Sequence, residues 1–199
     1  MTISPSHKVV VSISEGIATI TINNPAANTW DLESLPALKA VVNALNDMSD
    51  IRALVITGQG EKFFSAGADL NQFATGDATA AQAMGDAFGG AFETLADYRG
   101  VSIAAINGYA MGGGLEVALA CDIRIAERHA ALALPEAKVG LLPCAGGTQR
   151  LTQLVGEGWA KRIILCGERI SAEKALSLGL VEEVVDSGAS LSAARELAK

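Results

Sequence analysis

The sequence has few of the residues that mark disulfide-rich, metal-binding or thiol-dependent proteins. Its 199 residues include only three cysteines, Cys121, Cys144 and Cys166, and two histidines. An odd number of cysteines without a C-x-x-C pair indicates neither a disulfide framework nor a zinc site. We therefore expect no metal, and we predict that all three cysteines are core or near-core thiols. Cys144, which follows Pro143, is the one candidate for a reactive thiol, but no histidine lies near it in sequence.

Long apolar runs and basic stretches are also missing. Apolar segments such as residues 101–106 are far shorter than the roughly 20 residues of a membrane-spanning helix. The first residues, MTISP, lack the basic and apolar regions of a secretory signal, so we expect a cytoplasmic protein. The net charge of −7, without a basic stretch, argues against a nucleic-acid partner and favours a small molecule.

What the sequence does contain predicts an α/β chain with one core. Hydrophobic residues make up 50% of it and charged residues 19%, and no linker or repeat divides it. The apolar spacing predicts a hairpin over 8–22 and further strands over 52–57, 101–106, 122–126 and 181–185. Helices are predicted over 31–48, 78–96, 148–154, 159–165, 171–178 and 189–198, with a short one opening at the triple glycine 112–114.

The first segment with chemical potential is FFSAGADL, residues 63–70. Small residues directly after a strand let a ligand approach the backbone closely, and their N–H groups suit a carbonyl oxygen. The competing interpretation is a tight turn in which Asp69 caps the following segment.

The second segment is NGYAMGGGLE, residues 107–116. A helix that begins within the triple glycine presents unpaired N–H groups and the positive end of its dipole, which would stabilise an oxyanion. A glycine turn required only for packing is the alternative. The sequence argues against a nucleotide loop, because neither G-x-x-x-x-G-K-[ST] nor G-x-G-x-x-G with its acidic partner is present.

The third segment, residues 134–151, carries Glu136, as the second carries Glu116. Both glutamates stand in stretches with little other polarity, where an ionised carboxylate is costly without a partner or a function. Glu136 has a structural alternative, an ion pair with Lys138 or Arg150. If the two acids converge on one pocket, they can hold a water molecule and move a proton.

Together these segments resemble the crotonase superfamily, also called the enoyl-CoA hydratase/isomerase family. The resemblance implies the ClpP/crotonase fold, a spiral of ββα units. Members usually continue through several further helices that help to form a trimer, so we expect residues 1–199 to be a single crotonase-like domain truncated before those helices. The last predicted helix would then leave Leu191, Ala194 and Leu197 uncovered. The matching motifs are NNP at 23–25, FSAGAD at 64–69, NGYAMGGGLE at 107–116, PEAKVGLLP at 135–143, AGGTQRL at 145–151, GERISA at 167–172 and GLV at 179–181.

The resemblance also assigns the site. It implies that the amides of Ala68 and Gly113 hold the thioester carbonyl of an acyl-coenzyme A, and that Ala66, Asp69 and Leu70 contact the coenzyme. Keeping both Glu116 and Glu136 resembles the hydratases: Glu116 would assist attack of water at carbon 3, and Glu136 would supply the proton at carbon 2.

The activity implied is therefore that of an enoyl-CoA hydratase, a lyase of fatty-acid β-oxidation. Coenzyme A is part of the substrate and no separate cofactor is expected. A homotrimer or a dimer of trimers is the implied assembly. Two alternatives stay open: a Δ3-Δ2 enoyl-CoA isomerase, which needs one acid and no water, and a non-catalytic crotonase-fold binding protein.

Overall fold

A computed structural model describes residues 3–73 and 76–199, and its larger sheet has six strands. β1 and β2 form the predicted hairpin, whose turn residues Glu15 and Gly16 both have positive φ (58° and 73°), as a two-residue hairpin turn requires. All other neighbours in this sheet pair in parallel. The strand order is β1 (Val9–Ser14), β2 (Ile17–Ile22), β3 (Ala53–Gly58), β5 (Val101–Ile106), β7 (Ile123–Glu127) and β10 (Glu183–Val185).

A smaller sheet of four short strands stands beside the larger one. Its order is β4 (Phe63–Ser65), β6 (Tyr109–Met111), β8 (Ala131–Ala133) and β9 (Ile170–Ser171), and the first three are parallel. Segments of two or three residues are too short to show an alternating pattern, so the sequence did not predict them.

The chain repeats one order of elements: a strand of the larger sheet, a strand of the smaller sheet and then a helix. β3 and β4 precede α2 (Ala78–Ala96), β5 and β6 precede α3 (Gly113–Leu119), and β7 and β8 precede α4 (Gly147–Leu165). This repeated order is a spiral of ββα units, which confirms the predicted fold class.

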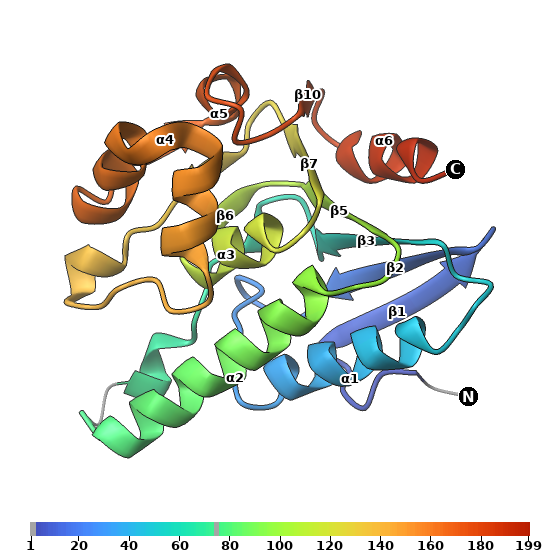
Figure 1. Cartoon of the computed structure of the whole chain (residues 1–199), viewed down its shortest axis with the longest axis horizontal. Helices are drawn as coiled ribbons and strands as arrows, with labels where there is room; N and C mark the ends of the chain where they lie inside the picture. The colour runs from blue at the N-terminus through green and yellow to red at the C-terminus, as the bar shows by residue number, and fades with distance from the viewer. Residues whose placement is uncertain (1–2, 74–75) are drawn as a thin grey trace.

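Helices cover both faces of the larger sheet. α1 (Ser34–Asn46) and α2 lie side by side on one face (Figure 1), where they bury alternate strand residues such as Leu54 and Ile56 in the main core. The intervening Val55 points to the other face and packs in a smaller cluster with Ala194 of α6 (Ser190–Leu197). The period of two along β3 therefore places apolar side chains on both faces, as predicted for a fully buried strand.

The expectation that the last helix has an uncovered apolar face is largely wrong. Ala194 is fully buried, and Leu191 packs against the smaller cluster, because α6 lies along β3, β5 and β7. Arg195 ties the helix to the hairpin by donating to the hydroxyls of Thr19 and Ser14, at 2.8 and 2.7 Å. Leu197 alone matches the expectation, with 55% of its surface exposed.

The carboxy-terminal third otherwise follows the prediction. α4 is interrupted at Gly156, whose φ of 76° and ψ of 163° are not helical, so the two predicted helices are the two parts of one element. α5 (Ala172–Ser177) follows β9. The cysteine prediction is correct only for Cys121, which is buried, whereas Cys144 and Cys166 are exposed.

Neither a membrane-spanning helix nor a metal-binding cluster is present in residues 3–73 and 76–199. No helix in these ranges is long and apolar enough to cross a membrane. In the same ranges no group of three or more histidine, cysteine, aspartate or glutamate residues is placed to hold a metal ion.

Candidate active site

The smaller sheet brings the three predicted site segments together. β4 ends at Ser65 and leads into residues 66–69, β6 ends at Met111 and leads into the triple glycine, and β8 ends at Ala133 shortly before Glu136. Because these strands are parallel neighbours, their carboxyl ends lie at one edge of the sheet. The fold thus places segments separated by about 70 residues around one point.

Two backbone amides at this edge are available to a ligand. The Cβ of an alanine at Gly67 would lie 3.1 Å from the Gly113 nitrogen, so the two segments are almost in contact. Within the described chain, neither the N–H of Ala68 nor that of Gly113 donates a hydrogen bond. Gly113 is the first residue of α3, where such an N–H has no partner inside the helix. The pair is suited to binding a carbonyl oxygen.

Glycines make this approach possible. Gly112 has φ 55° and ψ −127°, a backbone conformation that residues with a Cβ rarely adopt. A Cβ on Gly114 would lie 2.1 Å from the carbonyl oxygen of Ser65. The triple glycine is therefore required both by the turn and by close packing, so the packing alternative is correct for Gly114 without excluding a functional role for its neighbours.

The segment between β2 and α1, residues 23–33, holds Ala68 in place, and we call it the strap. Trp30 forms a parallel bridge with Ala68: its N–H donates to the Gly67 oxygen at 2.8 Å, and the Asp69 N–H donates to its carbonyl oxygen at 3.0 Å. The Trp30 ring is fully buried and packs edge-on against Phe92, with ring centroids 5.7 Å apart. These bonds use the Gly67 carbonyl and the Asp69 N–H and leave the Ala68 N–H between them unpaired.

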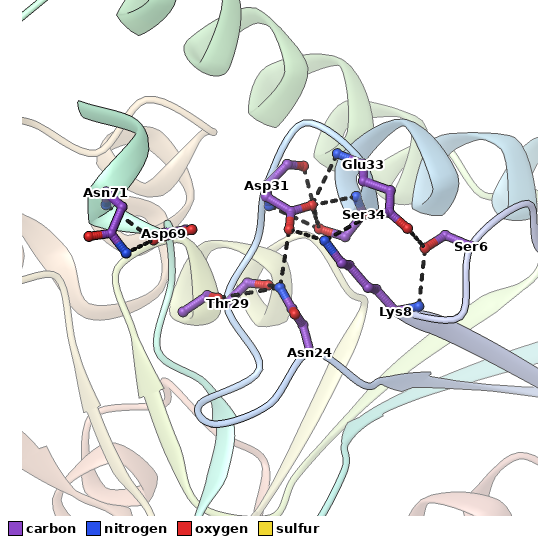
Figure 2. Close-up of polar contacts among 9 residues, drawn as sticks. All are labelled: Ser6, Lys8, Asn24, Thr29, Asp31, Glu33, Ser34, Asp69 and Asn71. Atoms are coloured by element: carbon purple, nitrogen blue, oxygen red, sulfur yellow. Dashed lines mark hydrogen bonds and ion pairs between the residues drawn. The ribbon is translucent and has the colours of Figure 1, made fainter. Parts of the chain in front are cut away.

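The strap is anchored at the next residue, Asp31, as Figure 2 shows. Its buried carboxylate accepts hydrogen bonds from Lys8 Nζ (2.6 Å) and from the backbone N–H of Ser34 (2.8 Å) at the start of α1. Asn24 donates both to Asp31 and to the carbonyl oxygen of Thr29. Burial alone would raise the pKa of Asp31, but the hydrogen bonds from Lys8 and Ser34 outweigh it and the pKa is lowered.

Glu116 is held by the chain that follows Glu136. Its side chain leaves α3 and is almost completely buried, and its Oε1 accepts hydrogen bonds from the N–H groups of Ala145 (2.8 Å) and Gly147 (2.9 Å). Burial raises its pKa, and the two N–H donors and Arg150 reduce that rise. A carboxylate fixed in this way is oriented for proton transfer.

Glu136 lies close to Gly112, and its carboxyl has fewer hydrogen-bond partners than that of Glu116. A Cβ on Gly112 would lie 3.1 Å from its Oε1, and its buried Oε2 has no hydrogen-bond partner among the described residues. Burial, together with the smaller effect of the neighbouring charge of Glu116, raises the pKa of Glu136 to about 7. Among the described residues, Glu136 forms no ion pair with Lys138 or Arg150. The structural alternative, an ion pair with one of them, is therefore wrong.

All seven predicted site residues line one cavity of about 860 Å³. Asp69 also has the capping role of the alternative interpretation, because its Oδ1 accepts from the N–H of Asn71 at 3.1 Å (Figure 2). Leu70 stands at the rim, 55% exposed. The cavity is lined further by residues that the sequence did not single out for this site, among them Thr29, Ala81, Gly85, Leu141, Leu142 and Cys144.

Cys144 lies in this lining, yet it is not an activated thiol. Although Cys144 as a whole is exposed, partial burial of its thiol, together with the charges of Glu116 and Glu136, raises its pKa to about 11. The thiolate is therefore scarce at neutral pH. Phe88 is a core residue, with 3% exposure, and it also forms part of the cavity wall.

Comparison with known proteins identifies the class to which this fold and site belong. The profile described as "Enoyl-CoA hydratase/isomerase" matches residues 12–199, and the chain belongs to this family. A short-chain-enoyl-CoA hydratase of Clostridium acetobutylicum is 37% identical over 193 residues, which are 96% of this chain and 74% of that protein. A carnitinyl-CoA dehydratase of Salmonella arizonae is 43% identical over 183 residues, 92% of this chain and 70% of the relative.

Solved structures show the same likeness. DspI of Pseudomonas aeruginosa is 67% identical, with a TM-score of 0.96 over 97% of this chain and 79% of that one. An enoyl-CoA hydratase of Bacillus anthracis is 38% identical, with a TM-score of 0.93 over 96% of this chain and 75% of the other. The chain thus spans about three quarters of the length of these relatives.

Proposed function

We propose that the protein is an enoyl-CoA hydratase, which adds water to the double bond of trans-2-enoyl-CoA thioesters in the degradation of fatty acids or related acyl groups. The observation that carries the proposal is the placement of Glu116 and Glu136 in one cavity, beside the unpaired amides of Ala68 and Gly113. Family membership and the relatives named as hydratases support it.

The amides stabilise the charge that develops during the reaction. When water attacks carbon 3, electrons move through carbon 2 to the thioester oxygen, which gains enolate character. Two N–H donors fixed at that oxygen bind the enolate more strongly than the neutral carbonyl, by about 3 kcal/mol for each donor in comparable sites. Ala68 and Gly113 would supply these donors without rearrangement, because neither has a partner to give up.

The glutamates complete the proton transfers. Glu116 takes a proton from the attacking water, whose oxygen bonds to carbon 3, and Glu136 gives its proton to carbon 2. With both carboxyls on the same side of the double bond, the addition is syn. A pKa near 7 means that Glu136 carries a proton in a large fraction of molecules at neutral pH, which suits the acid. The two carboxyls titrate as a coupled pair.

The remaining parts of the proposal follow the family. Ala66, Asp69 and Leu70, at the rim of the cavity, would contact the coenzyme A portion of the substrate. The reaction needs no separate cofactor. We also propose that the protein forms a homotrimer or a dimer of trimers and that it lies in the cytoplasm. Sedimentation of the purified chain measures its oligomeric state.

The reverse reaction is a second candidate, favoured by the carnitinyl-CoA dehydratase relatives. Removal of water from a 3-hydroxyacyl thioester uses the same two carboxyls in opposite roles. The isomerase alternative uses one carboxyl to shuttle a proton between carbons 2 and 4.

Product analysis distinguishes these reactions. Incubation with trans-2-butenoyl-CoA in ¹⁸O-labelled water, followed by mass spectrometry, should give a 3-hydroxy product that carries the label. A Δ3-Δ2 isomerase would shift the double bond of a 3-enoyl-CoA without taking up the label. A chain that binds enoyl-CoA but yields neither product would support the non-catalytic alternative, and preferential loss of water from carnitinyl-CoA would support the dehydratase.

A further inference from the structure

The side chains on one face of α2 line the cavity and become larger along the helix. Ala78, Ala81, Gly85 and Phe88 recur at intervals of three and four residues, so they share a face of the helix, and all four line the cavity. Along this face the side chains are small in the first half of the helix and large at Phe88. The cavity wall therefore opens towards the amino-terminal end of α2.

Phe88 closes the other end. A Cβ on Gly113 would lie 2.5 Å from the Phe88 ring, so this ring packs directly against the residue whose amide faces the thioester oxygen. Carbons 2 and 3 of a bound acyl group must lie at Glu116 and Glu136. Because the Phe88 ring occupies the space beside Gly113, further carbons would extend along the remaining lining of the cavity, which includes Gly85 and Ala81.

The packing around Gly85 does not require a glycine. A Cβ built there would meet no atom within 4 Å, and glycine is a poor residue for the interior of a helix. A larger side chain at this position would enter the cavity, because Gly85 is part of its lining. Gly89, one turn further along α2, has equally open surroundings but lies outside the cavity lining.

The facing wall is aliphatic. Val139, Leu141 and Leu142 line the cavity and are 55%, 37% and 64% exposed. Gln82 and Asp86 of α2 also line the cavity, and they are paired with each other, since Gln82 Nε2 donates to Asp86 Oδ1 at 2.8 Å. A hydrocarbon chain between these walls would cover the exposed leucines, with each buried methylene strengthening binding by about fourfold.

We propose that the acyl group of the substrate is an unbranched aliphatic chain longer than four carbons, which lies between α2 and residues 139–142, and that Gly85 is the position that sets its length. The inference rests on the proposed function for the identity of the site. Its substrate class differs from the short-chain specificity in the name of the Clostridium relative.

The test combines binding with turnover. Calorimetry should show that the unreactive octanoyl-CoA binds the unaltered chain at least tenfold more tightly than butanoyl-CoA, and that Gly85→Leu removes most of this preference. In turnover, the ratio of kcat/KM for trans-2-octenoyl-CoA to that for trans-2-butenoyl-CoA should fall at least tenfold in Gly85→Leu and by less in Gly85→Ala.

Gly89→Leu is the matched control, because it makes the same change in the same helix outside the cavity. It should leave both ratios within twofold of the unaltered chain. Circular dichroism should show that all variants are folded. Equal binding of the two saturated ligands, or an equal change of the ratios in Gly85→Leu and Gly89→Leu, would overturn the inference. Normal binding selectivity without hydration would instead count against the proposed function alone.

Discussion

Glu136 and Gly112 are so close that a Cβ on Gly112 would lie 3.1 Å from Glu136 Oε1. The glycine also turns the chain with φ 55°, so that the next amide, that of Gly113, is left unpaired at the edge of the small sheet. Gly112 therefore lies against the carboxyl proposed to donate the proton and precedes the amide proposed to bind the oxyanion.

Gly112→Ala should consequently damage both features. We expect kcat for hydration to fall at least tenfold and the free energy of unfolding to fall by about 1–2 kcal/mol, because alanine is strained at this φ. Steady-state kinetics and urea denaturation measure the two effects. Gly188→Ala is the control: Gly188 has φ 83° with no atom within 4 Å of a new Cβ, so it should lose similar stability without losing activity. Equal activity of the two variants would contradict this role for Gly112.

The rate of hydration should depend on pH through the same carboxyl. Burial and the charge of Glu116 raise the pKa of Glu136 to about 7, and Glu136 must be protonated to act as the acid. We expect kcat/KM to fall as the pH rises above about 7. It should also fall on the acid side, at a pH above the ordinary glutamate value of 4.5, because burial raises the pKa of Glu116 as well. A profile that is flat between pH 6 and 9 would be inconsistent with an acid of this pKa.

Stability should depend on pH in a related way. The pKa of Glu136 is about 7 in the folded chain and near 4.5 when unfolded, so the folded state binds more protons between these values. Stability from this group is complete below pH 4.5 and is lost as the pH rises to about 7. Glu136→Gln removes the cost of the buried charge, and after allowance for partial solvent exposure we expect it to raise the free energy of unfolding at pH 8 by about 1–2 kcal/mol.

The gain should shrink towards pH 4.5, which urea denaturation at both pH values would show. Glu157→Gln is the control, since Glu157 is exposed and paired with Lys161, so that its pKa is lowered. That variant should show no gain at pH 8. A Glu136→Gln protein that is no more stable than the unaltered chain at pH 8 would mean that the Glu136 pKa is not raised.

Much of the site could be predicted from the sequence because it is carried by short contiguous segments. Glycines that a turn requires, and glutamates in otherwise apolar stretches, can be recognised locally. The other five site residues were assigned by the resemblance to the family, and all seven line one cavity. The helices and the five longer strands of the larger sheet could be predicted for the same reason, since each is long enough to show its period; β10 has only three residues and lies within the predicted range 181–185.

The remainder depends on contacts between distant residues. The smaller sheet was missed because its strands have two or three residues, although it is this sheet that aligns the site segments. The exposure of Cys166 and the burial of Ala194 depend on how α4 and α6 pack, which periodicity within one helix does not determine. Lys8 and Asp31 are 23 positions apart, and no local pattern predicts their ion pair. Nor does one predict that Trp30, the residue before Asp31, pairs with Ala68.

That Lys8–Asp31 link leads to a further prediction. Asp31→Asn removes the charged acceptor beneath the strap that holds Ala68, so it should lower the free energy of unfolding by about 1–3 kcal/mol and also lower kcat. Glu33→Gln alters the exposed partner of the same lysine and should have little effect on either quantity. Urea denaturation and kinetics on both variants provide the comparison; an Asp31→Asn chain that behaves like Glu33→Gln would show that the anchor is dispensable.

The measurement that bears most directly on the two-carboxyl mechanism is the loss of enoyl-thioester absorbance of trans-2-butenoyl-CoA with the unaltered chain, Glu116→Gln and Glu136→Gln. We predict hydration by the unaltered chain and a loss of at least 100-fold in kcat in each variant, with binding of butanoyl-CoA retained. Glu196→Gln, which changes an exposed glutamate outside the cavity lining, should be fully active. Hydration that survives in either cavity variant at near the original rate would contradict the mechanism.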